Sequence, residues 1–316
     1  MKFKATVMFA AVLVCAILVF AKKSPSNGAL QSGDWTMRHA AGEEYAEFSL
    51  MSSHEGHQFQ HSSDWAVSEF HGLDLTKTAH QEVHFTIDRD AGTFQCQGYL
   101  ENGEGAGTFH FAANEKYPKE MASLGFSGIS ADEQFAMALH DVSLKFAQEM
   151  KDEHLQDLDK DKLIAFRIHG VSKNFIENIR AAGQDISDSD KLIAFRIHGV
   201  SPEMIRSLHQ SGYSPDADDL IAMRIHGATP EWIEQLKKDG YDHVQLDELI
   251  AFRIHGVSPE FIEKLQKLGY SHPEPEQLIA MRIHGVTPEF ISNLRGRGMQ
   301  NLSVDQLVSL RIHGID

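Results

Sequence analysis

The segment DELIAFRIHGVSPEF, residues 247–261, determines the fold class, because its central Arg-Ile-His-Gly recurs along the chain. Six copies follow one another at intervals of 28 or 29 residues, a regularity typical of repeat architectures. A worn seventh copy, Leu139–Ser143, lies one interval upstream and carries His140 in the histidine position. The arginine, histidine and glycine of the six clear copies are Arg167, His169 and Gly170; Arg196, His198 and Gly199; Arg224, His226 and Gly227; Arg253, His255 and Gly256; Arg282, His284 and Gly285; and Arg311, His313 and Gly314.

Each unit is predicted to contain two short helices. The first, such as Asp247 to His255, is expected to end before Gly256, which can adopt the left-handed conformation of a helix C-terminus. The second begins with Ser258 as N-cap and Pro259 at the first helical position. Helices this short are unstable alone, so they must stack on neighbouring units. We therefore expect an α-helical repeat array over residues 116–316.

The first helix of each unit is apolar around most of its circumference, which favours a buried inner position. Arg253 lies on this apolar arc, so its stem should be packed. We expect its head group to pair with an acid or to cap carbonyls of a neighbouring unit. The apolar residues of this helix are Leu249, Ile250, Ala251, Phe252 and Ile254.

The region upstream of the array favours β-strands. Residues 82–88, 93–100 and 108–112 alternate apolar and polar side chains and are separated by Gly-containing turns. This pattern predicts an antiparallel meander with one buried face, and Trp35, Tyr45 and Phe48 indicate an earlier strand pair. The predicted fold class is thus α+β: a β-meander domain followed by a helical array.

The N-terminus resembles a targeting segment. A short basic start precedes an apolar run over residues 5–21, and Val19-Phe20-Ala21 is a small-residue cleavage site. Cleavage by a signal peptidase is the favoured interpretation, and an uncleaved membrane anchor is the alternative. The predicted boundaries are residues 1–21 for this segment, 22–33 for a linker, 34–115 for the β-rich domain and 116–316 for the array. Export to a periplasm or beyond is expected.

Composition restricts the classes of function. The net charge of −16 argues against a nucleic-acid-binding protein, because phosphate neutralisation requires clustered Lys and Arg. The 42% hydrophobic residues argue against general disorder. If the signal segment is removed, Cys96 is the one cysteine left, so no intrachain disulfide could form. No motif predicts a cofactor, a catalytic nucleophile or a peptidase helix.

The 19 histidines suggest metal binding by composition. The array histidines lie at helix ends, and stacked helices are about 8–10 Å apart, too far for equivalent histidines to share an ion readily. We therefore expect a structural role for them, with collective titration near pH 6 as a weaker alternative. His54, His57 and His61 form a separate cluster whose spacing is compatible with a metal, although a polar loop is equally natural there.

The repeat of residues 247–261 resembles repeats in the extracytoplasmic regions of some bacterial proteins, including C-terminal regions of BlaR-type membrane metallopeptidase sensors. The strands at residues 90–94 and 105–109 resemble segments that precede those repeats. The resemblance covers about residues 34–316 and implies a sensor-side or interaction region. This chain lacks the multi-span membrane domain and the zinc-binding peptidase helix of those sensors, so no catalytic residue is carried over.

These observations predict a non-enzymatic, exported module that binds a protein or peptide partner, with no cofactor and no nucleic acid. Contact with a membrane would occur only through an uncleaved N-terminal anchor. The alternatives are a histidine-based metal-binding or pH-responsive sensor and an enzyme with a site in the β-rich region.

Overall fold

The computed structural model describes residues 31–54 and 57–315, so the predicted signal segment and most of the predicted linker lie outside it. The N-terminal part is a six-stranded antiparallel sheet with the strand order β3-β2-β1-β6-β5-β4. The strands are β1 (Ser32–Arg38), β2 (Tyr45–His54), β3 (His57–Ala66), β4 (Gln81–Arg89), β5 (Gly92–Glu101) and β6 (Glu104–Ala113), with a 3₁₀ turn η1 (Val67–Glu69) between β3 and β4.

One face of the sheet is apolar, as the alternation predicted. Val83, Phe85 and Ile87 of β4 are buried, whereas His84 between them is exposed. Trp35 is fully buried against the ring of Phe85 at 5.2 Å between centroids. The segment that begins at His57 forms the edge strand β3, paired with β2 along its whole length, so the alternative of a polar loop there is wrong.

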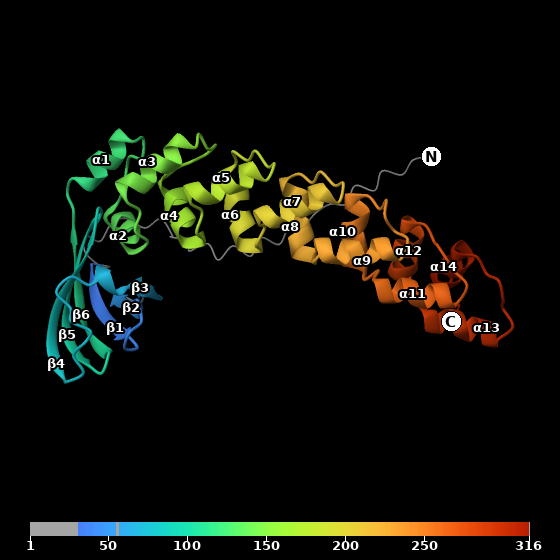
Figure 1. Ribbon diagram of the computed structural model, residues 1–316, viewed down its shortest axis with the longest axis horizontal. Coiled ribbons are helices and arrows are strands. Elements are labelled where there is room, and N and C mark those ends of the chain that lie inside the picture. Colours follow the sequence, from blue (N-terminus) through green and yellow to red (C-terminus); the bar gives the residue numbers. More distant parts are fainter. Residues whose placement is uncertain (1–30, 55–56, 316) are drawn as a thin grey trace.

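Helices fill the rest of the described chain. They are α1 (Tyr117–Ser123), α2 (Ala131–Leu139), α3 (Leu144–Asp152), α4 (Lys160–His169), α5 (Lys173–Ala181), α6 (Ser189–His198), α7 (Pro202–Gln210), α8 (Ala217–His226), α9 (Pro230–Lys238), α10 (Leu246–His255), α11 (Pro259–Lys267), α12 (Pro275–Ile283), α13 (Pro288–Gly296) and α14 (Val304–Ile312). The even-numbered helices from α4 to α14 stack one on the next, and odd-numbered helices stack in a second row. The array extends from the sheet as a curved rod (Figure 1). The fold is α+β, as predicted.

The helices begin and end at the capping, proline and glycine residues that the sequence predicted. Ser258 accepts a hydrogen bond from the backbone N–H of Phe261 at 3.2 Å, and Pro259 is the first residue of α11. Gly256 ends α10 with φ of +75°. Ser130 and Glu133 form the reciprocal N-terminal bonds of a capping box in α2.

The helix α2 joins the sheet to the array, because it packs on β5 and β6. Its Phe135 lies edge-on against Phe94 and Phe111, 5.7 and 5.4 Å away between ring centroids. Buried side chains from both parts form one continuous hydrophobic core, from Trp35 to Leu307. None of the helices in the described part of the chain has the length and hydropathy that a membrane crossing requires.

Candidate interaction surface on the repeat array

Each repeat arginine caps the preceding unit. Its Nε–H donates to the carbonyl oxygen of the repeat histidine one unit earlier, over 2.9–3.4 Å. The last carbonyls of a helix have no partner within it, so each bond satisfies one of them. This confirms the expectation that the arginines cap carbonyls of a neighbour. The donor–acceptor pairs are Arg167–His140, Arg196–His169, Arg224–His198, Arg253–His226, Arg282–His255 and Arg311–His284.

Most of these guanidinium groups also lie over an aromatic ring at the start of the preceding odd-numbered helix. Arg253 lies over Trp232 with 5.2 Å between its Cζ and the ring centroid. Four other repeat arginines use a phenylalanine in the same way. The equivalent position opposite Arg224 is Met204, so this arginine lacks a ring.

The glycine of the motif is required for two reasons. Gly256 has φ of +75°, and a Cβ added to it would lie 2.7 Å from Nη2 of Arg282. The glycine therefore permits both the left-handed helix end and the close approach of the next arginine. The arginine, the glycine and the histidine carbonyl thus all serve the stacking of units.

The isoleucine of the motif serves no such purpose. The repeat isoleucines are between 46% and 58% exposed, so the prediction that Ile254 is buried is wrong. Neighbouring helices cover an even-numbered helix on its sides and back, and its fourth face is left open. We call the exposed row the isoleucine stripe: Ile168, Ile197, Ile225, Ile254, Ile283 and Ile312.

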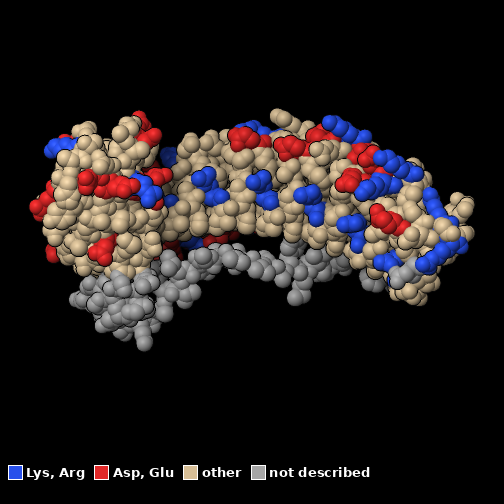
Figure 2. All heavy atoms as spheres, turned by 90° about the horizontal axis from the view of Figure 1, so that it is seen from below, with Lys and Arg blue, Asp and Glu red and all other residues tan. Residues whose placement is uncertain are grey.

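The surroundings of the stripe are shallow on one side and basic on the other. Three residues earlier in each helix, and therefore on the same face, stands a small residue: Ala251 in α10 and Ser309 in α14. The repeat arginine directly precedes the isoleucine in sequence. Lys and Arg side chains recur at even intervals along the array on the face seen in Figure 2. Each repeat arginine therefore lies about 100° around its helix from the isoleucine, so the stripe has a row of guanidinium groups on one flank.

Five of the six repeat histidine rings form no polar or aromatic contact within the described residues. Within residues 31–54 and 57–315, the rings of His169, His198, His226, His255 and His284 form no hydrogen bond, ion pair or ring contact. The ring of His313 donates from Nδ1 to the carbonyl oxygen of Ser309 at 2.8 Å. The stacking of units therefore uses the carbonyl oxygen of the repeat histidine. Most of the imidazole rings remain available to bind a partner next to the isoleucine stripe.

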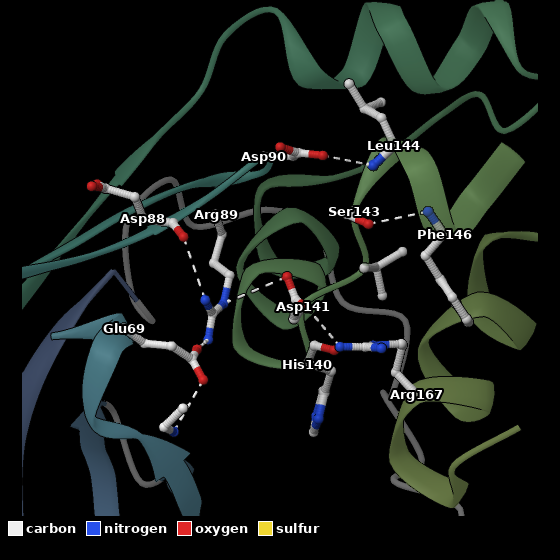
Figure 3. Close-up of polar contacts among 12 residues, drawn as sticks. Glu69, Asp88, Arg89, Asp90, His140, Asp141, Ser143, Leu144, Phe146 and Arg167 are labelled. Carbon is white, nitrogen blue, oxygen red and sulfur yellow. Dashed lines mark hydrogen bonds and ion pairs between the residues drawn. The ribbon is translucent and has the colours of Figure 1, made fainter. Parts of the chain in front are cut away.

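A polar network fixes the first unit against the sheet (Figure 3). Arg89 of β4 lies between Glu69 of η1 and Asp141, which follows α2, and pairs with both. Asp141 also accepts from Nη2 of Arg167 at 2.6 Å. Asp90 accepts from the backbone N–H of Leu144, the first residue of α3, at 2.8 Å. The direction in which the array leaves the sheet is therefore held by charged side chains from both parts.

His61 meets the histidine of the worn seventh repeat copy. Its ring lies edge-on to that of His140, 5.0 Å away between centroids. Burial, the neighbouring His61 and Arg167 lower the pKa of His140 to about 4, and burial lowers the pKa of His61. Both imidazoles are therefore neutral at pH 7.

The metal hypothesis for His54, His57 and His61 remains a prediction. His54 and His57 face each other in the β2–β3 register, but their side chains lie outside the description. A strand rises about 3.4 Å per residue, which places His61 roughly 14 Å along β3 from His57. Among the described residues, no group of three or more His, Cys, Asp or Glu side chains is arranged to hold a metal.

The outer face of β4, β5 and β6 carries a hollow of about 500 Å³, lined by residues such as His84, Gln97 and His110. Cys96 borders this hollow, but burial raises the pKa of its thiol to about 12. The thiolate needed for nucleophilic chemistry is therefore not formed near neutral pH.

A second series of hydrogen bonds between units was not predicted from the sequence. Tyr241 donates from its hydroxyl to the carbonyl oxygen of Pro273, and Tyr270 does so to Leu302, each over 2.8 Å. Gln184 makes the equivalent bond to Pro215 through its side-chain amide at 2.7 Å. The recurring Gly-Tyr pair indicates that the tyrosine has a structural role. Its hydrogen-bond acceptor cannot be predicted from local sequence, because the acceptor lies in the following unit.

The chain matches no known protein family, and no curated protein is similar enough to count as a match. The resemblance to BlaR-type repeats therefore stays a prediction.

Proposed function

We propose that this protein is an exported, non-enzymatic interaction module that binds a protein or peptide partner along the isoleucine stripe. One observation carries the proposal: six equivalent isoleucines, one in each even-numbered helix from α4 to α14, are each about half exposed. Contiguous exposed apolar side chains are typical of interaction sites. Helical arrays offer extended surfaces of this kind, and the sheet supplies a fixed base at one end.

The test replaces the central part of the stripe. In the full chain, Ile197→Gln, Ile225→Gln and Ile254→Gln are combined, since glutamine suits an exposed helical position. The control combines Tyr45→Gln and Tyr99→Gln, which remove the two large exposed apolar side chains of the sheet. Tagged proteins are incubated with solubilised cell envelope, and retained proteins are quantified after far-UV circular dichroism has verified folding.

We expect the stripe variant to lose a retained partner at least about tenfold, equivalent to about 1.4 kcal/mol of binding free energy, and the control to keep it. Retention unchanged in the stripe variant would contradict the proposal, whichever protein was captured.

A pH-responsive role is the second candidate, and the contact of His61 with His140 favours it. The two rings lie between the sheet and the first helical units, so protonation of either would place a charge in a half-buried contact. The test is the pH dependence of the urea midpoint, which His140→Gln should flatten between about pH 7.5 and pH 4.5.

A further inference from the structure

We infer that the partner of the isoleucine stripe is an acidic peptide in the polyproline II conformation, with an apolar side chain at every third residue. This inference rests on the proposed interaction function and specifies its ligand. Three features of the array carry it: the constancy of the exposed isoleucines, the absence of an ion pair at four of the repeat arginines within the described residues, and the spacing usual for stacked helices.

The repeats keep the exposed isoleucine as constant as the fully buried leucine five residues before it, of which Leu249 is one copy. Two residues before the isoleucine stands a buried or half-buried position that varies among phenylalanine, methionine and leucine, as in Phe252, Met281 and Leu310. The exposed isoleucine is the same in all six units. The units have thus diverged where packing tolerates it, and the exposed side chain has stayed constant. A requirement outside the fold explains this difference.

The arginines beside the stripe have unused hydrogen-bond donors. For Arg196, Arg224, Arg253 and Arg282, the hydrogen-bond acceptor found within the described part of the chain is a carbonyl oxygen on Nε, and neither Nη forms a hydrogen bond or ion pair there. Arg224 also attracts the carboxylate of Glu231 without pairing with it. Guanidinium groups bind carboxylates more strongly than neutral acceptors. A row of carboxylates from a partner would satisfy these groups.

The worn seventh copy shows that a carboxylate fits there. Asp141 occupies the position that Gly170 has in the next unit, and its carboxylate accepts from Nη2 of Arg167 at 2.6 Å. Asp141 has φ of +51°, the same left-handed conformation as the glycines. The first unit therefore provides its own carboxylate to the following arginine, whereas the glycines of the later units provide none and are approached closely by the arginine itself.

The spacing that is usual for stacked helices matches that of a polyproline II peptide. Stacked helices are about 8–10 Å apart. A polyproline II helix has three residues per turn and rises about 9.3 Å per turn, so every third side chain meets a successive unit on the same side. A β-strand instead repeats its faces every two residues, about 6.8 Å, which does not match.

The charges across the face orient the peptide. The even-numbered helices begin with an acidic row, as at Asp247, Glu276 and Asp305, seven residues or about 10 Å before each isoleucine. In the earlier units, Asp190 and Asp218 of this row pair with Lys162 and Lys191. Carboxylates of the ligand are repelled from this row and attracted to the arginine edge. The apolar side chain then faces the stripe, the acidic one faces the arginines, and the third faces solvent.

The probe is a fluorescent peptide of six Leu-Pro-Glu units, titrated with the full chain and followed by anisotropy. One comparison peptide has lysine for glutamate, and another has the same composition in the order Leu-Leu-Pro-Pro-Glu-Glu. We expect the first peptide to bind at least about tenfold more tightly than either comparison, and the isoleucine-to-glutamine variant to lose this binding.

A charge-blocking variant tests the arginine edge without removing an arginine. Gly199→Asp with Gly256→Asp copies Asp141 and should neutralise Arg224 and Arg282 within the chain. Gly199→Asn with Gly256→Asn is the matched neutral control, because asparagine has nearly the same shape, tolerates the left-handed conformation and displaces the guanidinium through its Cβ in the same way. We expect the aspartate variant to bind the peptide at least about fivefold more weakly than the asparagine variant.

Equal binding of the three peptides, or equal binding by the aspartate and asparagine variants, would overturn the inference. The proposed function can fail separately from it. Loss of a captured envelope protein in the isoleucine variant, without binding of the acidic peptide, leaves the interaction function standing and rejects this ligand. If the isoleucine variant captures the envelope protein as well as the wild type does, both the proposed function and the proposed ligand are rejected.

Discussion

The sheet is stabilised by contacts between residues far apart in the sequence, whereas the array is stabilised by contacts between neighbouring units. In the sheet, β1 pairs with β6, and the indole N–H of Trp35 donates to the carbonyl of Gln97 on β5 at 3.1 Å, so distant segments depend on one another. In the array, Arg253 and Tyr241 each reach only a neighbouring unit. The sheet should therefore unfold as one cooperative body, whereas damage in the array should stay local. The two regions meet at α2, where a repeat-like helix covers sheet residues.

The largest expected effect is at this meeting point. Phe135→Ala removes the ring that packs on Phe94 and Phe111, and truncating a buried phenylalanine costs about 3–5 kcal/mol of unfolding free energy. Phe252→Ala, in the fully buried middle of the array, is the matched control of similar cost. Urea unfolding followed by tryptophan fluorescence separates the two regions.

The tryptophans allow this separation because Trp35 and Trp65 lie in the sheet and Trp232 lies in the array. In a Trp232→Phe background, fluorescence reports the sheet alone. We expect Phe135→Ala to shift that transition to lower urea and Phe252→Ala to leave it nearly unchanged. An equal shift from both would show that the sheet and the array unfold as one unit, against the comparison drawn above.

The next effect is a pH dependence at the same boundary. The pKa of His140 is lowered from 6.5 to about 4, so between these values the unfolded chain binds more protons than the folded one. Its contribution is fully present above about pH 6.5 and is lost as pH falls towards 4, by roughly 3 kcal/mol at most. His140→Gln should flatten this part of the stability profile.

The matched control is His198→Gln at the equivalent position of a later unit, where the ring has no partner in the described part of the chain. Urea midpoints between about pH 7.5 and pH 4.5 measure both variants. A slope that persists in His140→Gln would assign the pH dependence to other groups, His61 first, because burial also lowers its pKa.

The array was more predictable from sequence than the sheet, because its helices depend on nearby residues and the strands depend on distant ones. Ser258, Pro259 and Gly256 carry local signals for helix ends, and the structure uses each as predicted. The edge strand β3 is polar and is defined by its pairing with β2, which no local pattern reveals. The sequence indicates His61 as a candidate metal ligand. Its contact with His140 could not be predicted, because it depends on how α2 crosses the sheet.

The error at Ile254 has a different origin. A helix that is apolar on all sides is predicted to be fully buried, and this holds when neighbours surround it. In a stack, each even-numbered helix has neighbours on both sides and an odd-numbered helix behind it, which leaves one face open. The sequence shows an apolar residue on that face, but it does not show whether protein or a partner covers it.

The smallest expected effect tests how local the array contacts are, with two glycines of similar backbone conformation. Gly256 and Gly269 have φ of +75° and +85°; a Cβ at Gly256 would meet Arg282, whereas a Cβ at Gly269 would have no described atom within 4 Å. Gly269→Ala should cost about 1 kcal/mol, the strain of a left-handed alanine. Gly256→Ala should cost roughly 2 kcal/mol, because it also displaces the guanidinium that caps His255.

Urea unfolding by far-UV circular dichroism measures both free energies, and the sheet fluorescence of the Trp232→Phe background should be unchanged in each variant. Adding Arg282→Ala to both glycine variants should remove the difference between them, since no guanidinium is then left to displace. If the two glycine variants cost the same while Arg282 is present, the arginine moves aside freely, and the bonds between units matter less to the array than the packing of its helices.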